Sequence, residues 1–234
     1  MVNPGSSARF RRVGVIIPAR NEAARIGPVL AGIARQVDDV PVISMVVDDG
    51  SSDGTDDVAR AHGARVITHV INLGKGAAMK TGCAAGLAAA CDVLVVMDAD
   101  GQHRPSDLPA MVGPILSGQA DLVLSRRRFT GQMPATARLG NWGLTRLFTI
   151  MFGASYADTQ CGLRAFTSEA YKHVDWLATG YAVETEMLVR AARAKLRTVE
   201  VDIETIYHDA YKGTTMLDGF RILGQMIRLR MSRS

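Results

Sequence analysis

Short apolar runs alternate with helix-like segments through the first 125 residues. The strand-length runs are residues 12–17, 42–47, 64–70, 93–97 and 121–125, and the helix-like segments between them are residues 21–36, 53–63, 75–90 and 106–118. This alternation predicts parallel strands joined by crossover helices that cover both faces of a sheet. We therefore expect an α/β protein with a doubly wound sheet.

The pattern changes after residue 125. A basic stretch, residues 126–138, precedes a helix from Leu139 to Phe152 that is apolar almost all round. A helix from Val183 to Ala194 and an alternating strand at 198–204 follow. A helix that is apolar on every side is either buried or in contact with lipid. We see no repeat and no linker, so we expect one domain over residues 1–234.

The two ends of the chain lie outside this alternation. Residues 1–12, before the first strand, are expected to be flexible. The C-terminal segment 219–234 contains four arginines and no acid, and one side of its helical wheel carries Phe220, Leu223, Ile227 and Met231. Such a pattern indicates a basic amphipathic helix that lies at a membrane interface. The alternative is a helix packed on the core with solvated arginines.

The composition supports a globular protein. The chain has 234 residues, 47% of them hydrophobic and 21% charged, which is enough to bury a full core. Its three cysteines lack metal-site spacing, which indicates small buried thiols in a reducing compartment. No apolar run approaches the roughly 20 residues of a membrane span, and the N-terminus has no signal-peptide core. We expect a cytoplasmic protein without a membrane anchor of its own.

Polar and charged residues that could take part in binding or catalysis follow four of the predicted strands. In a doubly wound sheet, ligands bind beyond the carboxyl ends of the strands. The segments at those positions are Pro18–Glu22, Asp48–Thr55, Asn72–Gly76 and Asp98–Gln102. They are acidic, glycine-rich or asparagine-bearing, and four such loops on one edge predict a binding site.

Asp98 and Asp100 directly follow the apolar run at residues 93–97. Alternation on a strand would place both carboxylates on one face, where they repel each other unless a cation lies between them. With Gln102 they offer the hard oxygen ligands that Mg²⁺ or Mn²⁺ accepts, and water and a ligand's diphosphate would complete the coordination. The alternative, a surface turn with solvated acids, fits poorly with the buried strand that precedes them.

The loops at residues 48–55 and 72–76 also contain residues suited to ligand binding. Capping of the helix that follows explains Ser51, Ser52 or Asp53, but the consecutive Asp48 and Asp49 suit contacts with a base or a ribose hydroxyl. Lys75 at a helix start would favour an anion. The segment around Lys75 does not have the spacing of a Walker A loop.

Five motifs occur in the order and spacing of family 2 glycosyltransferases with a GT-A fold: PARNE, DDGSSDGT, NLGKG, DADGQHRPSDL and DTQCGLRAF. The resemblance is strongest to the dolichyl- or polyprenyl-phosphate mannosyl and glucosyl synthases. It implies a single glycosyltransferase domain with a Rossmann-like, mixed and mostly parallel sheet flanked by helices. The implied donor is a nucleotide-sugar, GDP-mannose or UDP-glucose.

The resemblance also implies roles for individual residues. The metal, Mg²⁺ or Mn²⁺, would be held by Asp98, Asp100 and Gln102. The donor would be bound by Pro18, Arg20, Glu22, Asp49, Lys75 and Asp98. Related synthases close this site with an arginine-bearing segment that is absent here, so we expect Lys212, rather than His208, to take its place.

Acceptor and catalytic residues follow from the same resemblance. Arginines after a GSR stretch grip the acceptor phosphate in related synthases, and Arg126, after Ser125, and Arg138 stand at those positions, although Leu124 replaces the glycine. Asp158 corresponds to a proposed catalytic acid, Asp100 is the second residue expected to act in catalysis, and Arg164 closes the motif of Asp158.

The leading hypothesis is an inverting, metal-dependent hexosyltransferase that acts on a polyprenyl or dolichyl phosphate. It would lie on the cytoplasmic face of a membrane, by peripheral contact or through a separate membrane partner. One alternative is a family 2 transferase with a soluble sugar or small-molecule acceptor, and another is a non-catalytic nucleotide-sugar-binding partner of a membrane protein. Nucleic-acid binding is disfavoured because Phe129 is the only aromatic residue beside the arginines at 126–128.

Overall fold

A computed structural model of the chain describes residues 10–127, 135–178, 180, 182–204, 206 and 216–232. Within these ranges the side chains of residues 135–139, 141 and 216–221 are not described.

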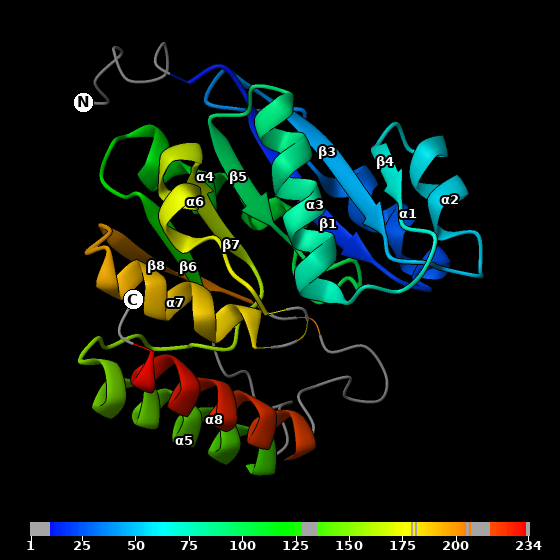
Figure 1. The fold of residues 1–234 in the computed structure, drawn as a ribbon. Helices are drawn as coiled ribbons and strands as arrows, with labels where there is room; N and C mark the ends of the chain where they lie inside the picture. Colours follow the sequence, from blue (N-terminus) through cyan, green and yellow to red (C-terminus); the bar gives the residue numbers. More distant parts are fainter. Residues whose placement is uncertain are drawn as a thin grey trace.

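Within the described residues, eight strands form one sheet whose two faces are covered by helices (Figure 1). Its order is β2-β3-β1-β5-β7-β6-β8, and β4 also pairs with β3. The strands that run in one direction are β1 (Val13–Ala19), β3 (Val40–Asp48), β4 (Arg65–Thr68), β5 (Val93–Val96), β6 (Leu122–Arg127) and β8 (Thr198–Ile203). The antiparallel strands are β2 (Gln36–Val37) and β7 (Arg164–Thr167).

The helices divide between the two faces. One face carries α1 (Ala23–Gly32), α2 (Thr55–Ala61), the 3-10 turn η2 (Pro105–Asp107) and α4 (Leu108–Leu116). The other carries α3 (Lys75–Ala88), α6 (Ser168–Val174) and α7 (Val183–Arg193), with α5 (Ala135–Phe152) and α8 (Met216–Met231) against the same core. Successive strand residues supply opposite cores, as Val95 and Leu94 of β5 do.

The predicted fold class is confirmed, and each predicted strand is present. Three short elements were not predicted: β2, β7 and α6. β7 has only four residues and carries a charged one, Arg164, so neither a long apolar run nor alternation marks it. It lies between β5 and β6, and the loop that leads into it therefore lies beside the end of β5.

Helix α8 packs one side on the core, as the alternative for the C-terminal segment expected, and its contact with a membrane stays a prediction. Ile222, Met226 and Leu229 pack into the core, whereas Ile227 and Met231 are 47% and 77% exposed. Of the stripe predicted for a membrane interface, Ile227 and Met231 are exposed and Leu223 is partly buried, and the side chain of Phe220 lies outside the described residues.

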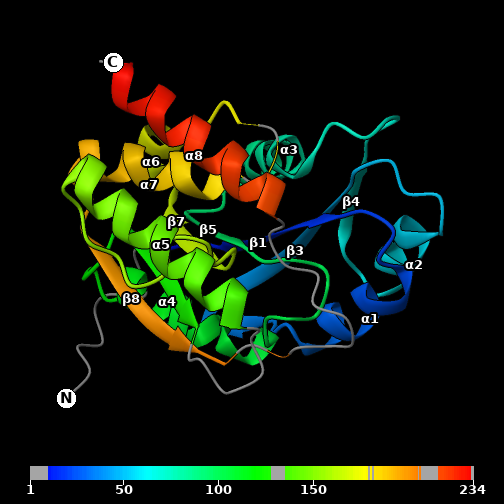
Figure 2. The same cartoon turned by 90° about the horizontal axis from the view of Figure 1, so that it is seen from below.

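Helix α5 lies beside α8, as Figures 1 and 2 both show, and it is likewise two-sided. Phe148 is buried, but Trp142 and Ile150 are 65% and 72% exposed. The helix is therefore not buried all round. Among the described residues, no helix is both long and apolar enough to cross a bilayer.

The segment before β1 is attached to the turn between α3 and β5. The Arg11 side chain forms an ion pair of 3.0 Å with Asp92, and Arg12 donates to the carbonyl of Ala89 at 2.6 Å. The rest of the segment expected to be flexible, residues 1–9, lies outside the described residues.

Candidate active site

The loops after β1 and β3 are hydrogen-bonded to each other. The amide of Asn21 donates to the Ser51 hydroxyl at 2.9 Å, and the amide of Glu22 donates to the Thr55 hydroxyl at 2.9 Å. Asp53 joins the starts of two helices, since its carboxylate accepts from the amides of Ala23 and Thr55 at 3.1 Å each. Asp53 thus satisfies the first amide of α2, although the N-cap position itself is Gly54.

The residues expected to bind a donor at this edge differ in exposure. Pro18 is buried within β1, Arg20 is exposed directly after the strand, and Glu22 is partly buried. Glu22 forms an ion pair with Arg25 at 3.1 Å. The contacts of these residues with a donor stay predictions.

Asp49 ties the second loop to the third. Its buried carboxylate accepts from the amides of Leu73 and Gly74 at 2.9 and 2.8 Å, and one of its oxygens lies 2.8 Å from Nδ1 of His69. Burial by itself would raise the pKa of Asp49, but these hydrogen bonds outweigh it and lower the pKa. In this structure Asp49 shapes the loop before α3, and its predicted contact with a donor stays a prediction.

Lys75, the first residue of α3, joins three parts of the chain. Its Nζ lies 2.7 Å from Asp98 Oδ1 and 3.0 Å from Oε1 of Glu184, which is buried in the first turn of α7. Burial alone would lower the pKa of Lys75, but the two carboxylates raise it above its ordinary value. Lys75 is therefore charged and links the third loop, the fourth loop and α7.

Asp98 and Asp100 lie close together, but not for the predicted reason. β5 ends at Val96, so both acids belong to a turn, and strand alternation does not apply to them. Burial raises the pKa of Asp100, and the charge of Asp98 raises it further. Asp98 has the opposite shift, because Lys75 and His103 outweigh its burial and lower its pKa. The repulsion between the two carboxylates that the sequence predicted is thus present, and it disfavours the ionised form of Asp100.

The carboxylates of this cluster are suited to binding a divalent cation. Asp98 and Glu184 share the ammonium of Lys75, and the carboxylate of Asp100 lies close enough to Asp98 for the two to repel each other. Among the described residues, no three His, Cys, Asp or Glu side chains are grouped as a metal cage. Two carboxylates and the Gln102 amide, completed by ligand oxygens, fit the incomplete protein sphere typical of Mg²⁺.

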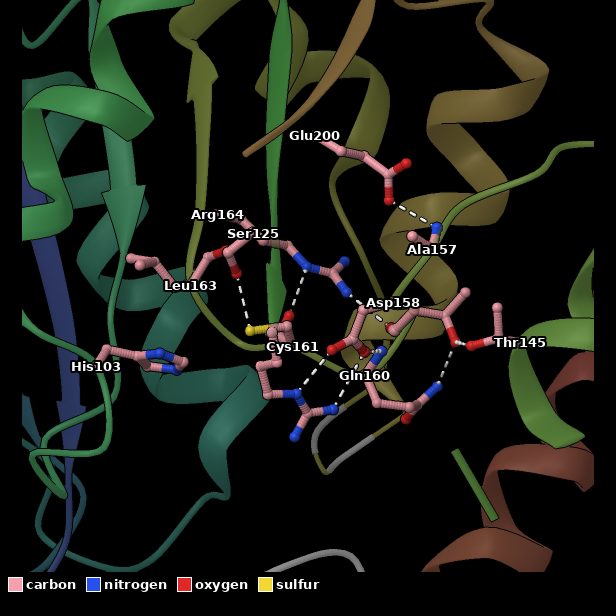
Figure 3. A network of polar contacts seen from close by, with 12 residues as sticks. His103, Ser125, Thr145, Ala157, Asp158, Gln160, Cys161, Leu163, Arg164 and Glu200 are labelled. Carbon is pink, nitrogen blue, oxygen red and sulfur yellow. Dashed lines mark hydrogen bonds and ion pairs between the residues drawn. The ribbon is translucent and has the colours of Figure 1, made fainter. Parts of the chain in front are cut away.

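The loop 158–163, which leads into β7, is held from several sides (Figure 3). Asp158 is buried and accepts from the Arg127 guanidinium at 2.7 and 3.1 Å. Ser125 donates to the carbonyl of Leu163 at 2.6 Å. The Thr145 hydroxyl of α5 lies 3.0 Å from that of Thr159. The loop that carries the predicted catalytic acid is thus fixed to β6 and α5.

Arg164 connects this loop to α7. Its fully buried guanidinium donates to the carbonyls of Thr159, Cys161 and Glu184 at 2.9, 3.1 and 2.6 Å. Gly162 of the same loop lies against the acidic cluster, because a Cβ at this position would come within 2.6 Å of Asp98 Oδ2 and 3.2 Å of Lys75 Nζ. The geometry gives Arg164 a positioning role, since it sets where Glu184 and Gly162 lie.

The arginines expected to bind the acceptor are distributed differently. Successive strand residues face opposite sides, so Arg126 and Arg127 of β6 diverge. Arg126 is exposed and forms an ion pair with Asp202, whereas Arg127 faces Asp158. The side chain of Arg138, in α5, lies outside the described residues, as do Lys212 and His208.

Two residues of the site were missed. Arg127 could have been found by counting alternate positions from the buried Ser125, which lies on the same side of β6. Glu184 gave no signal in the sequence, because its place beside Lys75 depends on where the tertiary fold positions the start of α7.

Comparisons with known proteins find a family and relatives that this chain resembles over most of its length. A family model described as Glycosyl transferase family 2 matches residues 14–174. The chain is 31% identical to the UDP-N-acetylglucosamine–dolichyl-phosphate N-acetylglucosaminyltransferase of Methanococcus voltae, over 94% of this chain and 96% of that protein. It is 34% identical to the undecaprenyl-phosphate mannosyltransferase of Micrococcus luteus, over 82% of each.

Solved structures show the same fold. The structure of glucosyl-3-phosphoglycerate synthase from Mycobacterium tuberculosis with phosphoglyceric acid superposes with a TM-score of 0.79 and 25% identity, over 99% of this chain and 84% of that one. Another structure of that synthase contains Mn²⁺ and UDP. The expected mixed, mostly parallel GT-A sheet is confirmed.

Proposed function

The chain belongs to glycosyl transferase family 2, and from this we propose that it transfers a sugar from a nucleotide-sugar to a polyprenyl phosphate. The observation that carries the proposal is the acidic cluster of Asp98, Asp100 and Glu184 around Lys75, at the edge where four loops meet. Two relatives, from Methanococcus voltae and Micrococcus luteus, bear names that specify a dolichyl- or undecaprenyl-phosphate acceptor. Those names specify different sugars, so GDP-mannose and UDP-glucose stand beside UDP-N-acetylglucosamine as donors to be tested.

The residues present fit a divalent cation, Mg²⁺ or Mn²⁺. Asp98, Asp100 and Gln102 would hold it, and when bound it would stabilise the negative charge that develops on the departing diphosphate. Lys75 lies beside these carboxylates and adds a second positive charge at the same place. A single stabiliser of this kind is typically worth about 3 to 4 kcal/mol in the transition state.

The donor would lie across the first three loops. Pro18, Arg20 and Glu22 line the end of β1, and Asp49 fixes the loop that presents Lys75. We place Lys212 at the same site by its position in the sequence. Glu184, whose Oε1 lies 3.0 Å from Lys75 Nζ, supports the position of that lysine from α7.

The acceptor requires little activation. A phosphate monoester has a second pKa of about 6 and is largely ionised at neutral pH, so it can attack without a general base. The ion pair of Asp158 with Arg127 suits this chemistry, because Asp158 then orients the site and need not take up a proton. Arg126 and Arg138 are proposed to bind the acceptor phosphate. In-line attack without a covalent intermediate inverts the anomeric centre and gives a β-linked product from an α-linked donor.

A soluble phosphorylated acceptor is the second candidate. It is favoured by the likeness to glucosyl-3-phosphoglycerate synthase, whose structure contains phosphoglyceric acid. With a hydroxyl acceptor, a general base would be needed, and Asp158 would have to leave Arg127 to supply it.

The experiment that separates these candidates measures turnover with Mn²⁺ and a panel of donors: UDP-glucose, UDP-N-acetylglucosamine and GDP-mannose. Each donor is offered with undecaprenyl phosphate or dolichyl phosphate in detergent, or with 3-phosphoglycerate. We expect release of nucleoside diphosphate and a glycosylated lipid phosphate by mass spectrometry. A product formed only from 3-phosphoglycerate would contradict the lipid acceptor, and donor binding without any turnover would favour a non-catalytic partner.

We further propose that the chain contacts the membrane peripherally, on the cytoplasmic face. Helices α5 and α8 lie next to each other (Figure 2), and each has exposed apolar residues together with exposed arginines. These are Trp142, Ile150, Ile227 and Met231, with Arg146, Arg228 and Arg230. Aromatic and aliphatic side chains that enter the headgroup region, next to arginines, are typical of binding to anionic lipid.

Trp142→Ala is expected to weaken binding to vesicles that contain anionic lipid by about tenfold, because a buried large apolar side chain is worth roughly 1.5 to 3 kcal/mol. Flotation with vesicles of phosphatidylglycerol and phosphatidylcholine measures this. Val70→Ala is the matched control, since Val70 is 98% exposed but lies in the loop after β4. Equal effects of the two substitutions would contradict the assigned face.

A further inference from the structure

The partly exposed carboxylate of Asp98 has close neighbours at both oxygens in this structure. Oδ1 lies 2.7 Å from Lys75 Nζ. Oδ2 faces the backbone of Gly162, where a Cβ would come within 2.6 Å, and lies 3.6 Å from Nε2 of His103. A cation that binds Asp98 through Oδ1 therefore competes with the ammonium of Lys75 for that oxygen. The backbone at Gly162 is held by the hydrogen bonds of the loop 158–163, whereas Lys75 has a flexible side chain.

Lys75 also has a second place to go. Its Nζ already lies 3.0 Å from Glu184 Oε1, and the other oxygen of Glu184 is buried without a hydrogen-bond partner among the described residues. An ammonium that leaves Asp98 can therefore stay paired with Glu184. After the move Asp98 pairs with the cation and Lys75 with Glu184, so neither charge is left without a partner.

We propose that Lys75 and the divalent cation compete for Asp98: Lys75 holds Asp98 in the metal-free protein and is transferred entirely to Glu184 when the cation binds. The inference rests on the metal site of the proposed function and adds a role for two residues. Lys75 is then a positioning residue that keeps the acidic turn in place before the metal arrives. Glu184 is the residue whose carboxylate pairs with Lys75 once the cation is bound.

The exchange has a consequence for metal affinity. Without nucleotide, a cation must break the ion pair of Lys75 with Asp98, so the metal-free form is favoured. Removal of the ammonium by Lys75→Met keeps most of the length of the side chain and leaves Asp98 open. The dissociation constant of Mn²⁺ should then fall by about tenfold or more, because like charges a few ångströms apart repel strongly near a protein surface.

The test is a titration of the nucleotide-free protein with Mn²⁺, followed by the electron paramagnetic resonance signal of free Mn²⁺. Lys80→Met is the matched control, since Lys80 is on the same helix but pairs with Asp175 at 3.0 Å. Lys75→Met should bind Mn²⁺ about tenfold more tightly, and Lys80→Met should bind it as the unmodified chain does. Lys75→Met should also unfold at a lower temperature without Mn²⁺ and recover when Mn²⁺ is added.

A double-substitution cycle separates exchange from a general effect of charge. Glu184→Gln takes away the receiving carboxylate and should weaken Mn²⁺ binding at least threefold in the unmodified chain. In the Lys75→Met background the same substitution should have little effect on Mn²⁺ binding, because no ammonium group remains that could pair with residue 184. If the two substitutions acted independently, their fold-changes in the dissociation constant of Mn²⁺ would instead multiply.

The outcomes distinguish the inference from the proposed function. Binding of Mn²⁺ by the unmodified chain, with no tightening in Lys75→Met or with multiplicative effects in the cycle, contradicts the exchange alone. If no variant binds Mn²⁺, even with UDP or GDP present, the metal site of the proposed function is wrong as well. If Lys75→Met does not fold, Lys75→Arg replaces it in the cycle. An arginine that still reaches Asp98 keeps the charge, so Glu184→Gln should weaken Mn²⁺ binding in the Lys75→Arg background as it does in the unmodified chain.

Discussion

Asp100→Asn is expected to lower kcat/KM by about a thousandfold, because it removes a charged oxygen from the turn that would hold the cation, and stabilisers of the leaving group contribute at this level. The same substitution should not destabilise the metal-free protein. Burial and Asp98 raise the pKa of Asp100, so its ionised form is disfavoured in the fold. At pH 7, above the ordinary pKa of an aspartate, removal of this charge should leave the free energy of unfolding unchanged or raise it.

Steady-state kinetics and thermal unfolding, both on the same preparation, measure the two effects. Asp56→Asn is a suitable control, since Asp56 is a partly exposed acid of α2 whose partner is Arg60 at 2.6 Å. It should change kcat/KM less than twofold. An Asp100→Asn variant with activity within tenfold of the unmodified chain would show that this carboxylate is not part of the reaction.

Arg164→Met is expected to lower the free energy of unfolding by at least about 3 kcal/mol. Methionine fills much of the buried space, but the carbonyls of Thr159, Cys161 and Glu184 lose their donor. Hydrogen bonds from a charged group contribute about 1.5 to 3 kcal/mol each, and buried carbonyls without a partner add to the cost. Urea denaturation followed by circular dichroism gives the value.

The control for this variant is Arg197→Met. Arg197 also bonds a carbonyl and a carboxylate, those of Gly118 and Asp121, but it is exposed. Exposed ion pairs contribute roughly 0 to 1 kcal/mol, so a small loss is expected. A loss below about 1 kcal/mol for Arg164→Met would mean that the loop 158–163 does not depend on its arginine.

Much of the fold could be predicted because its signals are local. The runs at residues 42–47 and 93–97 are apolar enough to be recognised as buried strands, and β3 and β5 cover them. The same alternation placed four loops at one edge, and hydrogen bonds and ion pairs now connect them in sequence: Asn21 to Ser51, Asp49 to Gly74, and Lys75 to Asp98. β7 was missed because its burial comes from its two neighbouring strands and not from its own composition.

The candidate site was predictable only in part, for a similar reason. Residue type and position after a strand identified Asp98, Asp100 and Lys75. They could not identify Glu184, which lies 109 positions after Lys75 and reaches it through the packing of α7. Nor could they show that Asp49 and Asp158 already have partners, because those partners, the amides of Leu73 and Gly74 and the guanidinium of Arg127, come from other segments.

The central claim is that the acidic turn after β5 holds a cation that binds the diphosphate of a nucleotide-sugar. Its most direct test is a crystal structure with Mn²⁺ and the nucleoside diphosphate that stabilises the protein most, with anomalous difference density recorded for manganese. We predict one manganese peak about 2 to 2.5 Å from carboxylate oxygens of Asp98 and Asp100, in contact with the diphosphate. A nucleotide bound elsewhere, or bound here while Asp98 remains paired with Lys75 and no manganese peak is present, would contradict the account.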